Sequence, residues 1–437
     1  MSTIGSKPGY QSVSKSGSIP RLNFSVRGRF LTRYVTSFLL ALSVVQSLAV
    51  FLSSPLVVAQ SSQIASEATS QNSDTQPIKL GMSTVLSGPS QYLGQAMSRG
   101  ISQLFERINA SGGIDGRRLQ LYVMDDAYIP DIAAANTEHL INSEGVLAII
   151  GNVGTPTAEQ VMPIVRDNGV VFFGAFTGSN SLRAVRENDV VFNYRASYEQ
   201  EMAVIVNHIM ESNISPRRIA LLLQANESGE LDGFGRAGLS AATSALEAIG
   251  FGYTENLIQA KYVVNSLETQ QAIIETLDAD YSPEAFILVG SYQPSSHFIQ
   301  YMQGIFPQAN FYNLSFAGAG ALADSLHSAQ LQSARRFSDR IYMTQVVPPA
   351  DVDLPDLPRD LVEREAHFTA QFFVSALGNI DGEIDRESIR EVMMTMFTQA
   401  ESGNSSQQSS VSSTSNQASD YVVLTRFQNG FWVGNQD

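Results

Sequence analysis

Cysteine is absent from this sequence, and histidine is scarce, with five residues among 437. Without cysteine the chain forms no disulfide bond and carries no lipid on an amino-terminal cysteine. The histidines show no paired spacing, so we predict no metal site and no cofactor. Catalytic signatures are missing as well: the sequence has no Gly-x-Ser-x-Gly elbow, His-Glu-x-x-His helix, Walker loop or dinucleotide fingerprint.

One acidic pair, Asp125-Asp126, follows the predicted strand 119–124. A cleft hydrolase that uses this pair is one alternative for the function. We expect instead that both side chains cap a turn and stay solvated, as aspartates after a strand commonly do. The sequence therefore predicts a protein that is not an enzyme.

Acidic residues are also missing from the first sixty positions, where six basic residues occur. An apolar run from Tyr34 to Val58 follows the basic residues and ends in the small-residue pattern Val57-Val58-Ala59. This order predicts a signal peptide over 1–59 and a periplasmic or extracellular location. An uncleaved amino-terminal anchor is the alternative, since the run is nearly long enough to span a bilayer.

Removing those six basic residues changes the formal net charge from −15 to −21. A surface this acidic repels phosphate backbones, so we expect no nucleic-acid partner. The content of 43% hydrophobic and 16% charged residues is typical of a globular protein. Residues 60–76 are rich in serine, glutamine and alanine, and they predict a disordered spacer.

From Ile78 onward, short apolar strands alternate with helical patterns, which predicts an α/β fold with parallel sheets. The predicted strands are 78–82, 119–124, 146–150, 170–173, 190–194, 219–223, 286–289, 311–314 and 341–347. The predicted helices include 155–167, 200–210, 235–248, 266–277 and 361–377. Two such runs occur, 78–191 and 219–347, and each is about the size of one lobe. The serine-rich tract 401–419 predicts a mobile insertion, and Asn429-Gly430 predicts a closing hairpin.

Two glycine-rich turns with hydroxyl side chains follow neighbouring predicted strands. In the first, Gly151–Gln160, we expect Thr155 to be the N-cap of a helix and Pro156 its first residue. The second, Gly174–Gly178, contains Thr177. Neighbouring parallel strands end at the same edge of a sheet, and the free N–H groups at a helix start favour an anion such as a carboxylate. A plain helix cap is the alternative interpretation of the first turn.

Aromatic residues lie in or just after the loops at this predicted edge, where they could shape a small-ligand site or simply pack in the core. These residues are Tyr92, Phe176, Tyr198, Phe234 and Tyr292.

Several motifs in order resemble the type I periplasmic solute-binding proteins of branched-chain amino-acid ABC transporters, the leucine/isoleucine/valine-binding family. The matching stretches are 86–94 (LSGPSQYLG), 108–116 (INASGGIDG), 125–127 (DDA), 150–155 (IGNVGT), 234–235 (FG) and 290–292 (GSY). The resemblance implies two Rossmann-like lobes with parallel sheets, joined by three hinge crossovers. Lobe 1 is expected to comprise 77–195 and 346–418, with the insertion at 400–419, and lobe 2 to comprise 196–345 and 419–437.

The resemblance also implies roles for individual residues. Thr155 and Thr177 would hold a ligand carboxylate with help from the backbone N–H near Ala175. Ser315 stands where the family places an acid for the ligand amino group, which argues against an ordinary α-amino acid. The residues expected to form or line the site are Tyr92, Thr155, Ala175, Thr177, Tyr198, Phe234, Tyr292 and Ser315.

Three further acidic residues, Glu227, Glu230 and Asp232, could replace the missing acid at Ser315. Two cysteines that pair in leucine-binding relatives correspond to Tyr128 and Gly154. The function implied is an exported binding protein that closes like a flytrap on a small, carboxylate-bearing, amino-acid-like metabolite and presents it to an ABC permease. A ligand-sensing input for a membrane receptor is the alternative partner role.

Overall fold

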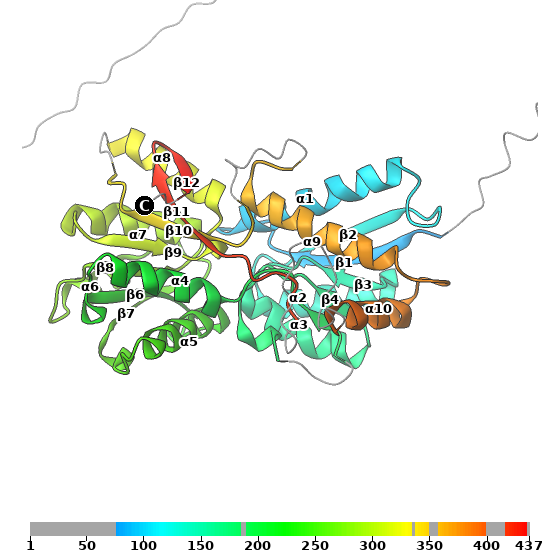
Figure 1. Ribbon diagram of the computed structural model, residues 1–437, viewed down its shortest axis with the longest axis horizontal. Coiled ribbons are helices and arrows are strands. Elements are labelled where there is room, and N and C mark those ends of the chain that lie inside the picture. Colours follow the sequence, from blue (N-terminus) through cyan, green and yellow to red (C-terminus); the bar gives the residue numbers. More distant parts are fainter. Residues whose placement is uncertain (1–75, 185–188, 334–336, 349–356, 399–415, 435–437) are drawn as a thin grey trace, which may run out of the picture. The chain divides into compact units, whose positions relative to one another are not determined.

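The computed structural model describes residues 76–184, 189–333, 337–348, 357–398 and 416–434. The predicted signal peptide 1–59, residues 60–75 of the spacer, and residues 400–415 of the predicted insertion lie outside these residues. The described residues belong to one compact unit that contains two β-sheets (Figure 1). No helix among them is both long enough and apolar enough to span a membrane.

The first sheet has five parallel strands in the order β2-β1-β3-β4-β5. Their bounds are β1 Ile78–Thr84, β2 Leu119–Asp125, β3 Ala148–Ile150, β4 Val171–Phe173 and β5 Val191–Phe192. The chain places β2 on one side of β1 and then β3 on the other side. The loops at the carboxyl ends of β1 and β3 therefore part at this reversal, which is where open α/β sheets bind ligands.

Helices cover both faces of this sheet, because each strand buries alternate side chains on opposite faces. Ile150 packs with the residues of α1, whereas Ile149 packs with those of α2 and α3. Gly100 lets α1 lie close against α9, since a Cβ atom there would lie 2.4 Å from the carbonyl oxygen of Glu363. The bounds are α1 Gln91–Ala110, α2 Pro130–His139, α3 Thr155–Asp167, α9 Leu361–Leu377 and α10 Arg386–Thr398.

The second sheet has seven strands in the order β12-β11-β10-β9-β8-β6-β7. Strands β6 to β10 run parallel, and β11 and β12 form an antiparallel hairpin on β10. The strand bounds are β6 Ile219–Ala225, β7 Ile258–Val263, β8 Ala285–Val289, β9 Asn310–Asn313, β10 Ile341–Gln345, β11 Val423–Gln428 and β12 Phe431–Gly434. The helix bounds are α4 Tyr198–Glu211, α5 Gly233–Ala248, α6 Gln270–Leu277, α7 Tyr292–Ile305 and α8 Ala319–Ser333.

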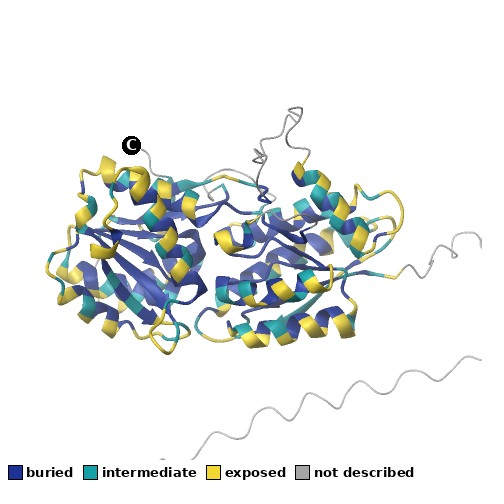
Figure 2. Cartoon of the chain, turned by 90° about the horizontal axis from the view of Figure 1, so that it is seen from below, coloured by how far each residue is buried: buried dark blue, intermediate teal, exposed yellow. Residues whose placement is uncertain are grey.

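Figure 2 shows that the central strands of both sheets are buried while the outer faces of the helices are exposed. Strand residues such as Leu80, Phe173, Leu222 and Phe286 have almost no accessible surface. Burying a side chain of this size contributes about 1.5–3 kcal/mol relative to leaving it in water. The buried side chains of both sheets therefore hold the strands in place, and with them the loops at the strand ends that carry the candidate site.

The parallel α/β fold expected from the sequence is confirmed, but one strand of the second sheet was not predicted. Strand β7 was missed because it is an edge strand in which Gln259 and Lys261 are half-exposed. Residues 416–419, at the end of the predicted insertion, are described, and the side chain of Asn416 donates hydrogen bonds to the carbonyls of Leu182 and Val191. These bonds satisfy polar groups beside β5, which a composition-based prediction does not detect.

Candidate functional site

Two threonine hydroxyls meet at the carboxyl edge of the first sheet. Thr155 begins α3, after the turn that follows β3, and Thr177 lies in the turn that follows β4. Their Oγ1 atoms are 2.7 Å apart, and both side chains are fully buried. A β-bridge between Val153 and Phe176 holds the two turns side by side. The structure thus brings together the two hydroxyls that the sequence placed at one edge.

The N-cap of α3 is Gly154, not Thr155 as expected from the sequence. Gly154 has a φ of 108°, and a Cβ atom on it would lie 2.4 Å from the ring of Tyr128, so the position requires glycine. The hydroxyl of Thr157 donates to the carbonyl of Val153 one turn back. The Thr155 hydroxyl is therefore not used for capping. It points to Thr177 at the amino-terminal, positive end of the helix.

Ala175 and Tyr198 complete the neighbourhood of the hydroxyl pair. The carbonyl of the buried Ala175 accepts from the Thr177 N–H at 2.8 Å, which makes the backbone turn tightly at this point. The hydroxyl oxygen of Tyr198, the first residue of α4, lies 3.4 Å from the Thr177 hydroxyl. Burial raises the pKa of Tyr198, so this hydroxyl keeps its proton and can donate.

A cluster of aromatic rings lies beside the hydroxyl pair and joins loops of both sheets. Phe316, in the 3₁₀ turn Ser315–Ala317 after β9, is 4.4 Å from Phe234 and 5.5 Å from Phe176 between ring centroids. The Phe234 ring in turn lies 5.4 Å from the Tyr198 ring. Tyr128 is the fifth member, 6.4 Å from Phe316. We call these five residues the aromatic cluster; the sequence did not single out Phe316 or Tyr128 as site residues.

Tyr92 and Tyr292 form a second aromatic pair, with ring centroids 5.9 Å apart in an edge-to-face arrangement. Nearby, Ser90 and Ser291 share a hydrogen bond of 3.2 Å. Both pairs connect the start of α1 with the start of α7, so they join loops that belong to different sheets. The hydroxyl of Tyr92 also donates to Asp360, the N-cap of α9.

Ser315 belongs to a buried ionic network that the sequence did not indicate. Its N–H and hydroxyl donate to the two carboxylate oxygens of Glu201 at 2.8 and 3.0 Å, and its hydroxyl accepts from Arg195. Arg195 also lies 3.6 Å from Glu365, whose pKa is raised to about 7 by burial despite the attraction of Arg195. The hydroxyl of Thr344 donates to Glu201 as well. In the sequence, the network could have been suspected only from Glu201, an acidic residue on the apolar face of α4 between Tyr198 and Ile205.

The acidic pair Asp125-Asp126 fixes the loop between β2 and α2 through hydrogen bonds. Asp126 is fully buried, so the expectation that it is solvated was wrong. It accepts from the hydroxyl of Ser83 and the N–H of Tyr128, both at 2.9 Å, and burial raises its pKa to about 6. Asp125 accepts from the N–H groups of Leu86 and Ala127. These bonds fix the tight turn at Ala127 and Tyr128, which places Tyr128 in the aromatic cluster.

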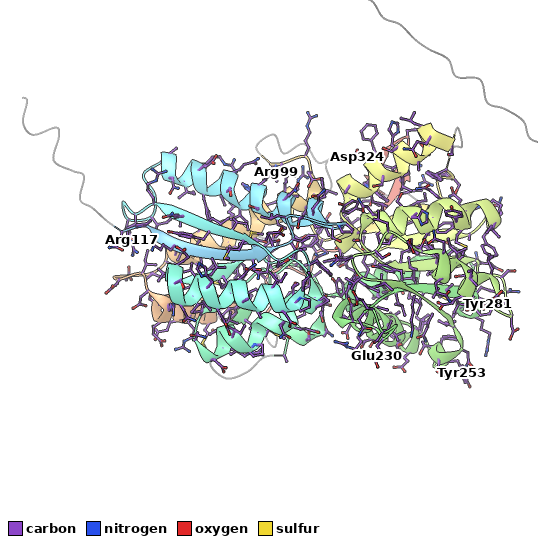
Figure 3. All side chains as sticks on the ribbon, turned by 180° about the vertical axis from the view of Figure 1, so that it is seen from behind. Arg99, Arg117, Glu230, Tyr253, Tyr281 and Asp324 are labelled. Carbon is purple, nitrogen blue, oxygen red and sulfur yellow. The ribbon has the colours of Figure 1, made fainter. Side chains whose placement is uncertain are left out.

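The three acids considered as replacements at Ser315 serve other purposes. Asp232 is the N-cap of α5: one oxygen accepts from Gly235 N–H at 2.9 Å and the other from Gln224 at 2.6 Å. Glu227 and Glu230 are exposed, and Glu230 is labelled in Figure 3. Tyr128 and Gly154 lie close together, since a Cβ atom on Gly154 would be 2.4 Å from the Tyr128 ring.

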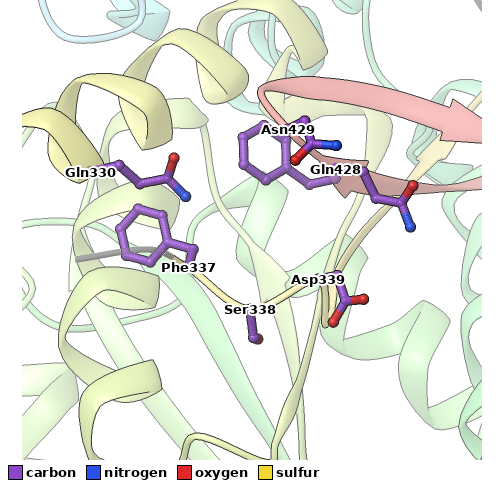
Figure 4. Close-up of a pocket in the computed structure, with 7 residues that line it drawn as sticks. Gln330, Phe337, Ser338, Asp339, Gln428 and Asn429 are labelled. Atoms are coloured by element: carbon purple, nitrogen blue, oxygen red, sulfur yellow. The ribbon is translucent and has the colours of Figure 1, made fainter. Parts of the chain in front are cut away.

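Of two pockets in the described residues, one adjoins the candidate site and the other lies apart from it. One of about 220 Å³ lies between α3, α4 and α5; it is bordered by Gly178, Tyr198 and Gly233 and by the ion pair of Glu159 with Arg236. It adjoins the hydroxyl pair through Tyr198. The other, of about 430 Å³, lies between α8, residues 337–339 and the β11–β12 turn, and is built from elements of the second sheet alone (Figure 4).

Comparison with known proteins shows which family this chain belongs to. The family model for periplasmic binding proteins matches residues 77–430. The chain is 27% identical over 153 residues to the Leu/Ile/Val-binding protein of Escherichia coli (strain K12), which covers 35% of this chain and 41% of that protein. The matched stretch thus spans less than half the length of that relative.

Solved structures are similar over nearly their whole length. A possible leucine/isoleucine/valine-binding protein from Rhodopirellula baltica SH 1 is 31% identical with a TM-score of 0.73, covering 83% of this chain and 97% of that one. A substrate-binding periplasmic protein from Ralstonia solanacearum is 20% identical with a TM-score of 0.68, covering 82% and 100%.

Two α/β sheets whose loops meet at a buried hydroxyl pair and an aromatic cluster define a binding protein of the type I periplasmic fold. The chain belongs to the periplasmic binding protein family. The resemblance found in the sequence motifs is thereby confirmed.

Proposed function

We propose that this protein is an exported solute-binding protein that holds a small carboxylate between two lobes and delivers it to an ABC permease. The observation that carries the proposal is the Thr155–Thr177 hydroxyl pair at the start of α3. Two hydroxyl donors beside the positive end of a 13-residue helix are suited to a carboxylate, because charge-assisted hydrogen bonds are the strong ones. The names of the relatives support a ligand of amino-acid size.

The proposed lobes are 77–195 with 346–418, and 196–345 with 419–437. Strands β1–β5 lie in one sheet and β6–β12 in the other, which supports this division. Side chains from both sheets meet at the aromatic cluster and at the Tyr92–Tyr292 pair. A ligand that contacts both lobes shifts the population toward the closed form, which the permease then recognises. Export relies on residues 1–59, and catalysis by Asp125 or Asp126 is not part of the proposal.

Replacing Thr155 with valine tests the carboxylate grip. We expect Thr155→Val to weaken binding by about 1–3 kcal/mol, because one donor is lost and a buried carboxylate oxygen is left without a partner. The measurement is calorimetric titration with the tightest-binding acid of a panel of L-leucine, 4-methyl-2-oxopentanoate and 3-phenylpropanoate.

The matched control is Thr395→Val, since Thr395 is exposed on α10 and its hydroxyl bonds only within that helix. The control should bind like the unchanged protein. If Thr155→Val does so too while its circular dichroism remains native, the hydroxyl pair does not hold the ligand and the proposed function loses its basis.

A further inference from the structure

The carboxylate groups that reach the aromatic cluster are already paired. In the part of the chain that the structure describes, the buried acids beside it include Glu201, Asp232 and Asp126. The two oxygens of Asp126 accept from Ser83 and from the N–H of Tyr128. Both oxygens of Glu201 accept hydrogen bonds from Ser315, with Thr344 and Arg195 adding further donors. One oxygen of Asp232 caps α5 through the N–H of Gly235, and the other accepts from the side chain of Gln224. A ligand ammonium at this place would therefore be buried without an acceptor of opposite charge, which is costly.

A cation already lies at the edge of the cluster. The guanidinium carbon of Arg195 is 4.5 Å from the centroid of the Phe176 ring, and Arg195 is fully buried. Its Nε and Nη1 atoms make no hydrogen bond within the described residues, although Nε lies 3.6 Å from Glu365. A second positive charge next to the same ring would be repelled, whereas negative or neutral groups are tolerated there.

The aromatic cluster supplies the apolar groups of the candidate site. Phe176, Phe234 and Phe316 are almost completely buried and come from three different segments: the turn after β4, the start of α5 and the 3₁₀ turn after β9. They can therefore enclose a flat or branched apolar body from several sides. Aromatic rings favour such a body through burial of apolar area and through offset or edge-to-face contacts.

From these observations we infer that the ligand is a monocarboxylate with an apolar or aromatic body and no ammonium group beside the carboxylate. The inference rests on the proposed function and narrows it: the carboxylate is held by Thr155 and Thr177, and the body lies among the rings of the aromatic cluster. Branched 2-oxo acids and aryl-alkanoic acids have this chemistry, and α-amino acids do not.

Glu159 is another carboxylate near the hydroxyl pair that could accept a ligand ammonium. It lies four residues after Thr155 and therefore on the same face of α3. Its carboxylate is 3.2 Å from the guanidinium of Arg236, at the mouth of the 220 Å³ pocket. Because Arg236 neutralises it and its side chain is partly exposed, Glu159 does not offer a buried charge for an ammonium.

Matched ligand pairs test the inference by calorimetry on the mature chain. L-Leucine is compared with 4-methyl-2-oxopentanoate, and L-phenylalanine with 3-phenylpropanoate. We expect the ammonium-free member of each pair to bind at least tenfold more tightly. If the amino acids bind equally well or better, the inference is wrong while the proposed function stands. If no member of either pair binds, the carboxylate-binding function and the inference fail together.

Two variants show which residues set the preference. Glu159→Gln should leave the binding of both ammonium-free acids unchanged; an amino-acid affinity that falls in this variant would identify Glu159 as an ammonium acceptor and overturn the inference. Phe316→Leu should weaken 3-phenylpropanoate at least fivefold. Phe431→Leu is its control, since Phe431 is 72% exposed. Equal affinity in Phe316→Leu and its control would remove the aromatic cluster from the site.

Discussion

Arg195→Met is expected to lower the free energy of unfolding by roughly 3–5 kcal/mol, because removing one member of a buried ionic network strands the remaining charges. Arg195 has no accessible surface and lies 3.5 Å from Glu201 and 3.6 Å from Glu365. Methionine fills a similar volume without the charge, so the loss reports the unpaired carboxylates more than a cavity. Urea denaturation followed by circular dichroism measures the difference.

The control for this variant is Arg236→Met. The Arg236 side chain is 61% exposed and pairs with Glu159 at 3.2 Å, so its removal should cost no more than about 1 kcal/mol. Adding Glu365→Gln to Arg195→Met should restore part of the lost stability, because the stranded charge is then neutral. A loss no larger than that of Arg236→Met would show that the buried network does not stabilise the fold.

The hydroxyl pair was predictable because it depends on local sequence. The apolar strand residues before Gly151 and before Gly174 indicate neighbouring strands, and parallel strands end at one edge. Helical periodicity also gave the bounds of α3 and α9 as the structure has them. Only the cap was misplaced: threonine is a common N-cap, whereas the choice of Gly154 depends on its contact with Tyr128, which lies 26 residues earlier.

The ionic network could not be predicted, because it depends on contacts between distant parts of the chain. Arg195 and Ser315 are separated by 120 residues, and Glu201 and Thr344 by 143. Sequence periodicity predicts that buried positions are apolar, so a glutamate such as Glu201 is predicted to be exposed even where the structure buries it. For the same reason Asp126 was expected at the surface, although it is fully buried and its carboxylate accepts hydrogen bonds from Ser83 and Tyr128.

Asp126 makes the stability of the protein depend on pH. Burial raises its pKa to about 6, against 3.8 in the unfolded chain, so the folded state binds the proton more tightly. Below about pH 4 both states are protonated and stability is greatest. Between about pH 4 and 6 only the unfolded state ionises, and stability falls by about 1.4 kcal/mol per pH unit. We therefore expect a loss of about 3 kcal/mol across this window that is absent from Asp126→Asn.

The measurement is urea denaturation at half-unit steps from pH 3.5 to 7, with the Asp126→Asn curve subtracted from that of the unchanged protein. Asparagine keeps an oxygen that can accept from Ser83 or from the Tyr128 N–H, so the loop that places Tyr128 is retained. Asp385→Asn provides a control of opposite sign, because hydrogen bonds from Ser388 lower the pKa of Asp385. Its stability contribution is lost as the pH falls, whereas that of Asp126 is lost as the pH rises. A flat difference curve for Asp126→Asn would mean that the Asp126 carboxyl has the same pKa in the folded and unfolded states, and therefore that burial does not raise this pKa in solution.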